Sequence, residues 1–426
     1  MGSKSVIFIS LCVVLVLGIL LGCTPPAPAE PATPPTTTTP TKVTEYMIPT
    51  FIDATDVYAE LYNTTVLPAT QSAYEGWNTD VGSKIGVKIL NKIYDTKYNF
   101  SEASSLYDRS VQTDKPIAYN MLVSPGALAN RDKFSVNKTP AVIWFSYAAA
   151  ATPDGWLFAP GRAYPQHYAT AIEYLVANDW KNTARKPRIA IATFSGVYSN
   201  DLVSTIEPWL KTNDKIEYVG AFFHDGAPVD LTGYVRDLMK AEPDYIQLGT
   251  TSVSLPAYYK ALEDLGYLHK VTHLHPCYQS LDLAARGVGW DKLEGDFAVA
   301  PANAAPGTRA FDWFTKYGDK YYKGATFGST TVSYAAGTYL LLAAVERAAA
   351  KVGADKITGP DIYDAINGQS FTSAELSDVT SDITLIPADR LSGVNTLYMY
   401  KAVDGKEVMV GTMPVVEDPI LKTWLK

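Results

Sequence analysis

Residues 188–194, Arg-Ile-Ala-Ile-Ala-Thr-Phe, form a short apolar run that leads into a longer amphipathic segment. The chain repeats this alternation several times before residue 301. We expect strands at residues 188–194, 216–223, 245–248, 271–275 and 297–300, with helices at 165–178, 199–212, 230–241, 254–265 and 280–286. Short, nearly continuous apolar strands separated by helices are typical of a parallel sheet that is covered on both faces.

The same alternation occurs upstream of this segment. We expect strands at residues 44–48, 87–94, 117–122 and 141–145, and helices at 66–79, 101–112 and 125–134. Downstream, we expect helices at 308–323, 331–352 and 360–367, followed by strands at 397–402 and 407–410. The loop Ala159-Pro160-Gly161 separates the upstream series, which ends with the strand at 141–145, from the series that begins with the helix at 165–178. A chain of this length exceeds what one hydrophobic core normally holds. The sequence therefore predicts an α/β protein with two domains.

The N-terminal region predicts export. The apolar run from Val6 to Leu21 follows Lys4 and is shorter than the roughly 20 residues that a membrane-spanning helix needs. Its end, Leu20-Leu21-Gly22-Cys23, resembles the bacterial lipobox, so we expect a signal peptide over residues 1–22 and a lipid on Cys23. The Pro-, Thr- and Ala-rich residues that follow, up to residue 42, would form an extended tether. The alternative is an uncleaved membrane helix.

Charge and cysteine content restrict the partners of the exported chain. Lys4 is the only charged residue of the expected signal peptide, so its removal takes the Lys and Arg count from 36 to 35 against 44 Asp and Glu, a formal net charge of −9. An acidic chain without a basic cluster is a poor match for nucleic acid and for anionic lipid, so the lipid on Cys23 would provide the attachment. Cys277 would be the one remaining thiol, which excludes an intramolecular disulfide.

Small and aromatic residues gather in the loops near the ends of the expected strands. These loops are Ile48-Pro49-Thr50 with Asp56-Val57-Tyr58-Ala59, Tyr94-Asp95-Thr96-Lys97, Ser124-Pro125-Gly126-Ala127-Leu128-Ala129, Ser146-Tyr147-Ala148-Ala149-Ala150, Phe194-Ser195-Gly196-Val197-Tyr198-Ser199, Gly249-Thr250-Thr251 and Pro276-Cys277-Tyr278-Gln279. Together with the order of the segments, they resemble the type I periplasmic binding proteins that serve branched-chain amino acid importers of the ATP-binding-cassette (ABC) class. The resemblance extends from Val43 to the C-terminus.

The resemblance implies two doubly wound, parallel-sheet (Rossmann-like) lobes joined by a three-segment hinge near residues 160–165, 299–306 and 372–395. The first lobe would comprise residues 43–162 plus 302–372, and the second lobe residues 163–301 plus 373–426. A small solute would be trapped between the carboxyl ends of the two sheets. The protein would then deliver it to a membrane permease, as a lipid-anchored, extracytoplasmic monomer that is not an enzyme.

The resemblance also implies a set of ligand-binding residues. They are Tyr58, Ser124, Pro125, Gly126, Ala127, Ser146, Tyr147, Ala148 and Ala149 in the first lobe, and Tyr198, Thr250, Thr251, Tyr278 and Gln279 in the second. N–H groups at the start of the helix near Ser124 suit a carboxylate. The loop from Pro276 to Gln279 lacks the acid that amino-acid-binding relatives offer to a ligand ammonium, which favours an uncharged or carboxylate-only solute. The 28 Tyr residues of the chain suggest an aromatic one.

Other functions remain as alternatives. A sensor that signals to a membrane receptor would have the same sequence features. The metal-like cluster of the chain consists of His269, His273, His275 and Cys277. In a strand, His273, His275 and Cys277 would share one face, but a structural site needs a fourth well-spaced ligand, so we expect no metal and no other cofactor. The nucleophile-elbow, phosphate-loop and dinucleotide-binding motifs are absent from the sequence, which makes a hydrolase or another enzyme the weaker interpretation.

Overall fold

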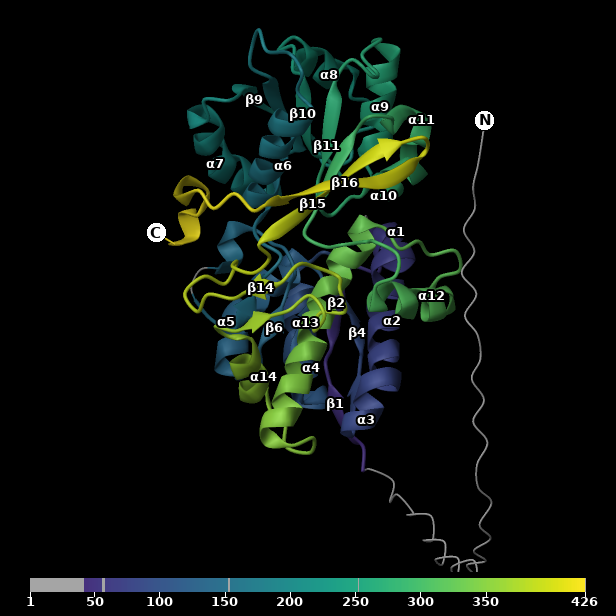
Figure 1. Cartoon of the computed structure of the whole chain (residues 1–426), viewed down its shortest axis with the longest axis vertical. Helices are drawn as coiled ribbons and strands as arrows, with labels where there is room; N and C mark the ends of the chain where they lie inside the picture. Colours follow the sequence, from purple (N-terminus) through teal and green to yellow (C-terminus); the bar gives the residue numbers. More distant parts are fainter. Residues whose placement is uncertain (1–41, 56–57, 152–153, 252, 426) are drawn as a thin grey trace, which may run out of the picture. The chain divides into compact units, whose positions relative to one another are not determined.

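The computed structural model describes residues 42–55, 58–151, 154–251 and 253–425 (Figure 1). The predicted signal peptide, Cys23 and the predicted tether up to residue 41 lie outside these ranges. Within them, no helix has both the length and the apolar character that crossing a membrane requires.

The N-terminal strands pair in parallel and form a five-stranded sheet and a two-stranded sheet. They are β1 (Thr44–Met47), β2 (Thr50–Ile52), β3 (Val87–Leu90), β4 (Ile93–Asp95), β5 (Tyr119–Met121), β6 (Ala141–Val142) and β7 (Leu157–Phe158). Five of them have the order β4-β2-β5-β6-β7, and β1 pairs with β3. The strand predicted at 44–48 corresponds to β1, whereas β2 was not predicted; Pro49, whose nitrogen has no hydrogen to donate, separates the two. The ladder continues past it, since the Ile48 N–H donates to Leu90 O at 3.0 Å.

Helices cover this sheet. They are α1 (Ala59–Leu61), α2 (Leu67–Trp77), α3 (Ser83–Ile85), α4 (Phe100–Asp114), α5 (Ser124–Val136), α12 (Arg309–Tyr321), α13 (Ser329–Val352) and α14 (Gly359–Ile366). Wider, π-helical turns at Tyr62–Val66 and Asn78–Gly82 flank α2. Helix α13 is largely buried and lies against α2, β5 and β6, which agrees with its nearly uniform apolar sequence.

A second sheet is built from β8 (Arg188–Phe194), β9 (Glu217–His224), β10 (Tyr245–Gly249), β11 (Thr272–His275), β12 (Phe297–Ala300), β15 (Thr396–Val403) and β16 (Lys406–Pro414). The strand order is β16-β15-β12-β11-β10-β8-β9. Its helices are α6 (Tyr164–Asn178), α7 (Val197–Thr212), α8 (Thr232–Met239), α9 (Leu255–Asp264), α10 (Leu281–Val288) and α11 (Trp290–Leu293). In Figure 1 this sheet occupies the upper half of the view.

Strand β8 shows why both faces of the second sheet are covered. Ile189 and Ile191 belong to the core that includes residues of α6 and α7, whereas Ala190 and Ala192 belong to the separate core beneath α8, α9 and α10. Successive side chains of a strand point to opposite faces, so an apolar run without alternation needs helices on both. The predicted two-lobe α/β fold is confirmed, and the bounds of the strands at 188–194 and 297–300 agree with the prediction.

The C-terminal strands depart from a purely parallel sheet. Strand β15 runs antiparallel to β12, and β16 runs antiparallel to β15. The turn between β15 and β16 is Asp404-Gly405, with φ values of 51° and 73°. Two consecutive positive φ angles make a tight hairpin turn, for which Asp-Gly is a favoured pair. The sheet is therefore parallel in its centre and antiparallel at one edge.

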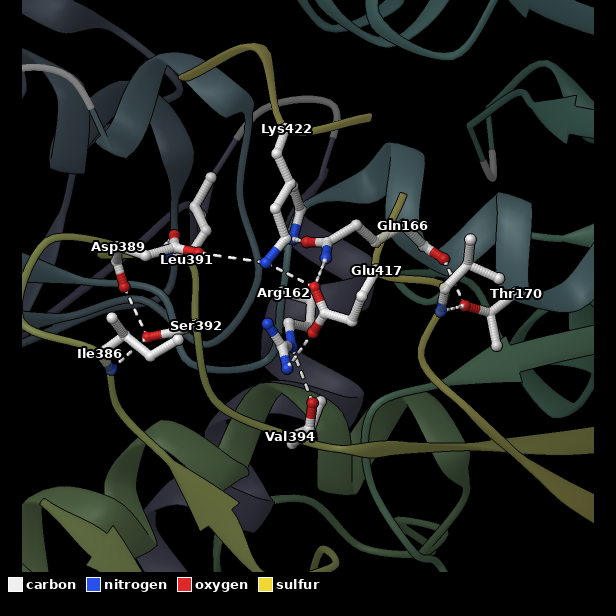
Figure 2. A network of polar contacts seen from close by, with 12 residues as sticks. Arg162, Gln166, Thr170, Ile386, Asp389, Leu391, Ser392, Val394, Glu417 and Lys422 are labelled. Atoms are coloured by element: carbon white, nitrogen blue, oxygen red, sulfur yellow. Dashed lines mark hydrogen bonds and ion pairs between the residues drawn. The ribbon is translucent and has the colours of Figure 1, made fainter. Parts of the chain in front are cut away.

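Three segments cross between the sheets, and hydrogen bonds hold them side by side. Val394 N–H donates to Pro160 O at 2.8 Å, and Asn303 N–H donates to Val379 O at 2.6 Å. Arg162, which is buried and has a φ of 81°, donates from Nε to Val394 O at 2.7 Å and pairs with Glu417 at 2.7 Å (Figure 2). The C-terminal segment is thus attached to the first and third crossings.

The limits of the two lobes stay predictions. Residues 373–394, assigned from the sequence to the second lobe, include Arg390, which donates to Asn367 Oδ1 at 2.6 Å and to Tyr363 Oη at 3.0 Å. These partners lie in and just after α14, so this part of the third crossing has contacts with the first lobe.

Candidate ligand-binding site

A pocket lies where the carboxyl ends of the two sheets face each other. We call it the tyrosine pocket; its lining residues are Tyr58, Leu61, Tyr62, Tyr98, Met121, Leu122, Ser124, Ile143, Trp144, Phe145, Tyr147, Tyr164, Phe194, Tyr198, Thr251, Tyr278, Gln279, Leu283 and Tyr334. The space between them is about 770 Å³, part of which is open to solvent. The loops after β5 and β6 approach from one sheet, and those after β8, β10 and β11 approach from the other, as expected for parallel α/β sheets.

Eight tyrosines dominate the wall, and their rings pack mainly edge to face. Tyr198 lies 5.1 Å from Tyr164 and 5.4 Å from Tyr278 between ring centroids, with interplanar angles of 81° and 88°. Tyr147, from the loop after β6, lies 6.2 Å from Tyr198 and so joins the two sides of the pocket. Edge-to-face packing orders such rings, and each ring still offers apolar surface to a ligand.

The position of Tyr198 depends on a glycine. Gly249 ends β10, and a Cβ there would lie 2.3 Å from Thr193 Oγ1 and 3.4 Å from the Tyr198 ring. The Tyr198 hydroxyl is held at 2.9 Å from that of Tyr168, which also donates to Leu248 O at 3.0 Å. Tyr198 is therefore fixed by both its ring and its hydroxyl.

The wall of the tyrosine pocket is uncharged. Among the residues that the structure describes, no Asp, Glu, Lys, Arg or His lines it. Burial raises the pKa of Tyr164, Tyr198 and Tyr278 well above the ordinary value for tyrosine, and it raises the pKa of Tyr147 to about 12. All these hydroxyls consequently stay protonated at neutral pH.

Gln279 is the strongest polar feature of the wall. Its side chain is 1% exposed, and neither its Nε2 nor its Oε1 has a hydrogen-bond partner among the described residues. A buried amide without partners is costly, whereas a ligand that both accepts and donates a hydrogen bond would satisfy it.

Half of the fourteen residues implied by the resemblance line the pocket: Tyr58, Ser124, Tyr147, Tyr198, Thr251, Tyr278 and Gln279. The others do not: Pro125, Gly126, Ala127, Ser146, Ala148, Ala149 and Thr250. Gly126 packs toward Val123 and Met121, and Ala127 is fully buried. The Ala148 N–H is used within the protein, since it donates to Asp201 Oδ2 at 3.1 Å.

Several lining residues were missed because no strand-end loop marks them. Tyr334 lies inside α13, Tyr62 begins the turn before α2, and Tyr164 begins α6. Tyr98 is different, because it directly follows the strand-end loop Tyr94-Asp95-Thr96-Lys97 that the sequence indicated. The four-residue spacing of Tyr58 and Tyr62, which is one helical turn, was the signal that could have indicated a second tyrosine beside the first.

The metal-like cluster of the sequence does not come together around a cavity. His269 is exposed, whereas His273 and His275 are buried beside Asp296 and Tyr259. Within the described ranges, no group of three or more His, Cys, Asp and Glu side chains has a metal-binding arrangement. Burial alone would raise the pKa of Asp296, but the charge and hydrogen bond of His273, with the hydrogen bond of His275, hold it well below the ordinary value.

A model of the family described as periplasmic binding protein matches residues 45–407. The chain belongs to the periplasmic binding protein family. The resemblance inferred from the cleft loops is therefore confirmed at the level of the family. As a member of this family, the protein is a solute-binding protein.

Solved structures share the fold of this periplasmic binding protein. A branched-chain amino acid ABC transporter protein from Thermus thermophilus with bound valine has 15% identity and a TM-score of 0.75, with 89% of this chain and 98% of that chain covered. An ABC transporter substrate-binding protein from Aeropyrum pernix has 16% identity and a TM-score of 0.72, with coverage of 89% and 98%. A solute-binding protein from Rhodopseudomonas palustris BisB5, in complex with 3,4-dihydroxybenzoic acid, has 16% identity and a TM-score of 0.67, with coverage of 88% and 99%. No curated protein sequence matches the chain.

Proposed function

We propose that this protein captures a small solute in the tyrosine pocket and delivers it, unchanged, to the permease of an ABC importer. A lipid on Cys23 would hold it at the outer face of the cell membrane as a monomer. The observation that carries the proposal is the pocket itself, which is formed at the carboxyl ends of two sheets in a chain of the periplasmic binding protein family. The contact residues would be Tyr58, Ser124, Tyr147, Tyr198, Thr251, Tyr278 and Gln279.

Polar contacts between the two lobes support a mechanism of closure. Asp201 of α7 accepts from the Ala148 N–H, and Arg286 of α10 donates to Thr64 Oγ1 at 3.0 Å. Each contact joins elements of different sheets and would break if the lobes separated. A solute that contacts both walls would stabilise the closed form in proportion to its preference over the open one, and the permease would recognise that form.

Native mass spectrometry of freshly purified protein tests solute capture. We expect a small molecule to be carried over, to be released by unfolding, and to rebind in unchanged form. X-ray scattering should show contraction of the protein when this solute is returned. Recovery of a chemically altered molecule, or scattering that does not change with a bound solute, would contradict the proposal.

A pair of tyrosine variants tests the position of the site. Tyr198→Ala should weaken binding of the recovered solute by at least about tenfold, because it removes an anchoring ring from the wall. Tyr322→Ala is the matched control, since Tyr322 is 41% exposed and lies outside the pocket. Equal affinities of the two variants, with unfolding curves that show both folded, would place the site elsewhere.

The anchor is tested separately. The natural chain should fractionate with membranes and be released by detergent, whereas Cys23→Ser should lose the lipid and its mass. A Cys23→Ser protein with unchanged mass and unchanged membrane association would show that lipid on Cys23 is not the anchor.

A further inference from the structure

We propose that the solute of the tyrosine pocket is an uncharged aromatic molecule with a hydrogen-bonding group such as a carboxamide, and that the pocket discriminates against carboxylates and amino acids. This inference rests on the proposed function and narrows the class of solute. Three observations carry it: a loop whose N–H group already holds a protein carboxylate, a helix start that contributes only Ser124 to the pocket wall, and an uncharged wall with an unpartnered amide.

The loop expected to hold a solute carboxylate is already occupied by a carboxylate of the protein. Residues Ala148–Ala151 form a short 3₁₀ turn after β6, and the Ala148 N–H donates to Asp201 Oδ2 at 3.1 Å. Arg131 donates to Ala149 O of this turn at 2.8 Å and also pairs with Asp132. A solute carboxylate would have to displace Asp201 or lie next to it, and like charges at such a distance repel.

The start of α5 offers little to an anion. Ser124 is its one residue among the pocket lining, Pro125 has no N–H, and the Ala127 N–H donates to Val123 O at 3.1 Å. Of the N–H groups that the sequence expected to bind a carboxylate, those of Pro125, Gly126 and Ala127 are therefore absent, outside the pocket wall or used, and Ser124 is left as the residue of this helix start that faces a solute.

The wall matches a neutral ring with a polar substituent. Its aromatic and aliphatic side chains would surround a ring, and no lining residue could neutralise a buried charge. The Gln279 amide has both its donor and its acceptor unused, and a carboxamide or an equivalent group would satisfy both.

A matched series of ligands tests this inference. Isothermal titration of the solute-free full chain would compare 4-hydroxybenzamide, 4-hydroxybenzoate, tyrosine and benzyltrimethylammonium. We expect 4-hydroxybenzamide to bind at least about tenfold more tightly than each charged compound, because only it enters without burying an unpaired charge. Tighter binding of any charged compound, or no binding of the amide, would overturn the inference. The benzyltrimethylammonium arm is included because tyrosine rings can also hold a soft cation.

Three variants make the test specific. Gln279→Leu should lower the affinity for 4-hydroxybenzamide at least about fivefold by removing the amide partner. Gln247→Leu is its control, because Gln247 is an equally buried amide without partners but lies outside the pocket. Asp201→Asn should raise the affinity for 4-hydroxybenzoate relative to the amide, because it removes the competing charge. Equal effects of the two Gln variants, or an unchanged ratio in Asp201→Asn, would contradict the inference.

The two levels of the proposal fail in different ways. If native mass spectrometry recovers a charged solute, or if 4-hydroxybenzoate or tyrosine binds most tightly, the inferred class of solute is wrong and solute capture stands. If no solute of any class is carried over and no scattering change occurs, the proposed function itself fails.

Discussion

The buried imidazole of His167 should make the stability of this protein depend on pH. His167 lies on α6 next to the first crossing, is 1% exposed, and contacts Gly161 O through Nε2 at 2.5 Å, while its Nδ1 has no partner among the described residues. Burial is the main cause that lowers its pKa, from an ordinary 6.5 to about 4, and the charge of Arg162 acts in the same direction. The folded protein therefore holds the neutral ring.

The sign and size of the effect follow from this lowered pKa. Above pH 6.5, His167 is neutral in both the folded and the unfolded state and has no effect. As the pH falls toward 4, the unfolded chain takes up a proton that the folded protein refuses, so the free energy of unfolding decreases. Each pKa unit is worth about 1.4 kcal/mol, which gives a loss of about 2 kcal/mol between about pH 7.5 and about pH 5.

Denaturant unfolding of the natural chain and of His167→Gln at both pH values measures this loss. The Gln amide can still donate to Gly161 O but cannot be protonated, so the difference in stability between the two proteins should change by about 2 kcal/mol. All other titrating groups are common to both proteins and cancel. His269→Gln, at an exposed position, is the control for the same change of residue type. Parallel pH profiles of the natural chain and His167→Gln would refute the reasoning.

Three further changes have defined outcomes. Asp296→Asn should destabilise the protein by about 3 kcal/mol at neutral pH, because it breaks a buried charged network. This difference should shrink as the pH falls below about 4, because the unfolded natural chain then takes up a proton on Asp296 that the folded protein, with its lowered pKa, does not take up; denaturation of both proteins measures it. Gly393→Ala should cost at least about 3 kcal/mol in the same assay, because its Cβ would lie 1.8 Å from Pro160 O at the hinge. Glu407→Gln should weaken solute binding about fivefold in titrations. The Glu407 carboxylate accepts hydrogen bonds from the Leu281 N–H at 2.8 Å and the Ser329 N–H at 3.0 Å, which lie at the starts of α10 and α13 in different lobes. A neutral amide holds these two helix starts together less strongly.

The fold of this chain could be predicted from local pattern. Alternating apolar runs and helix-length segments located most elements of both sheets, because a strand buried on both faces must be apolar throughout and a covering helix must show a helical period. The short strands β2 and β7 were not predicted. The antiparallel edge was not predicted from the same pattern, although the Asp404-Gly405 pair is a local signal for a hairpin. Each of these features depends on neighbours in the sequence.

The residues that line the tyrosine pocket depend on tertiary structure much more than the order of strands and helices does. Strand-end loops led to Tyr198, Tyr278 and Gln279, because parallel strands place their carboxyl ends at one edge. Sequence alone did not show that Tyr334, from the interior of a late helix, shares a wall with Tyr62, because that contact depends on how α13 packs against the first sheet.

The use of the loop after β6 also depended on three-dimensional packing. Its small residues suited a carboxylate, and the sequence did not reveal that Asp201, 53 positions after Ala148, supplies one from the other lobe. Backbone periodicity is a property of short segments, so it can be read along the chain. The partner of a buried N–H or amide is set by which distant surfaces meet, and only the folded chain brings those surfaces together.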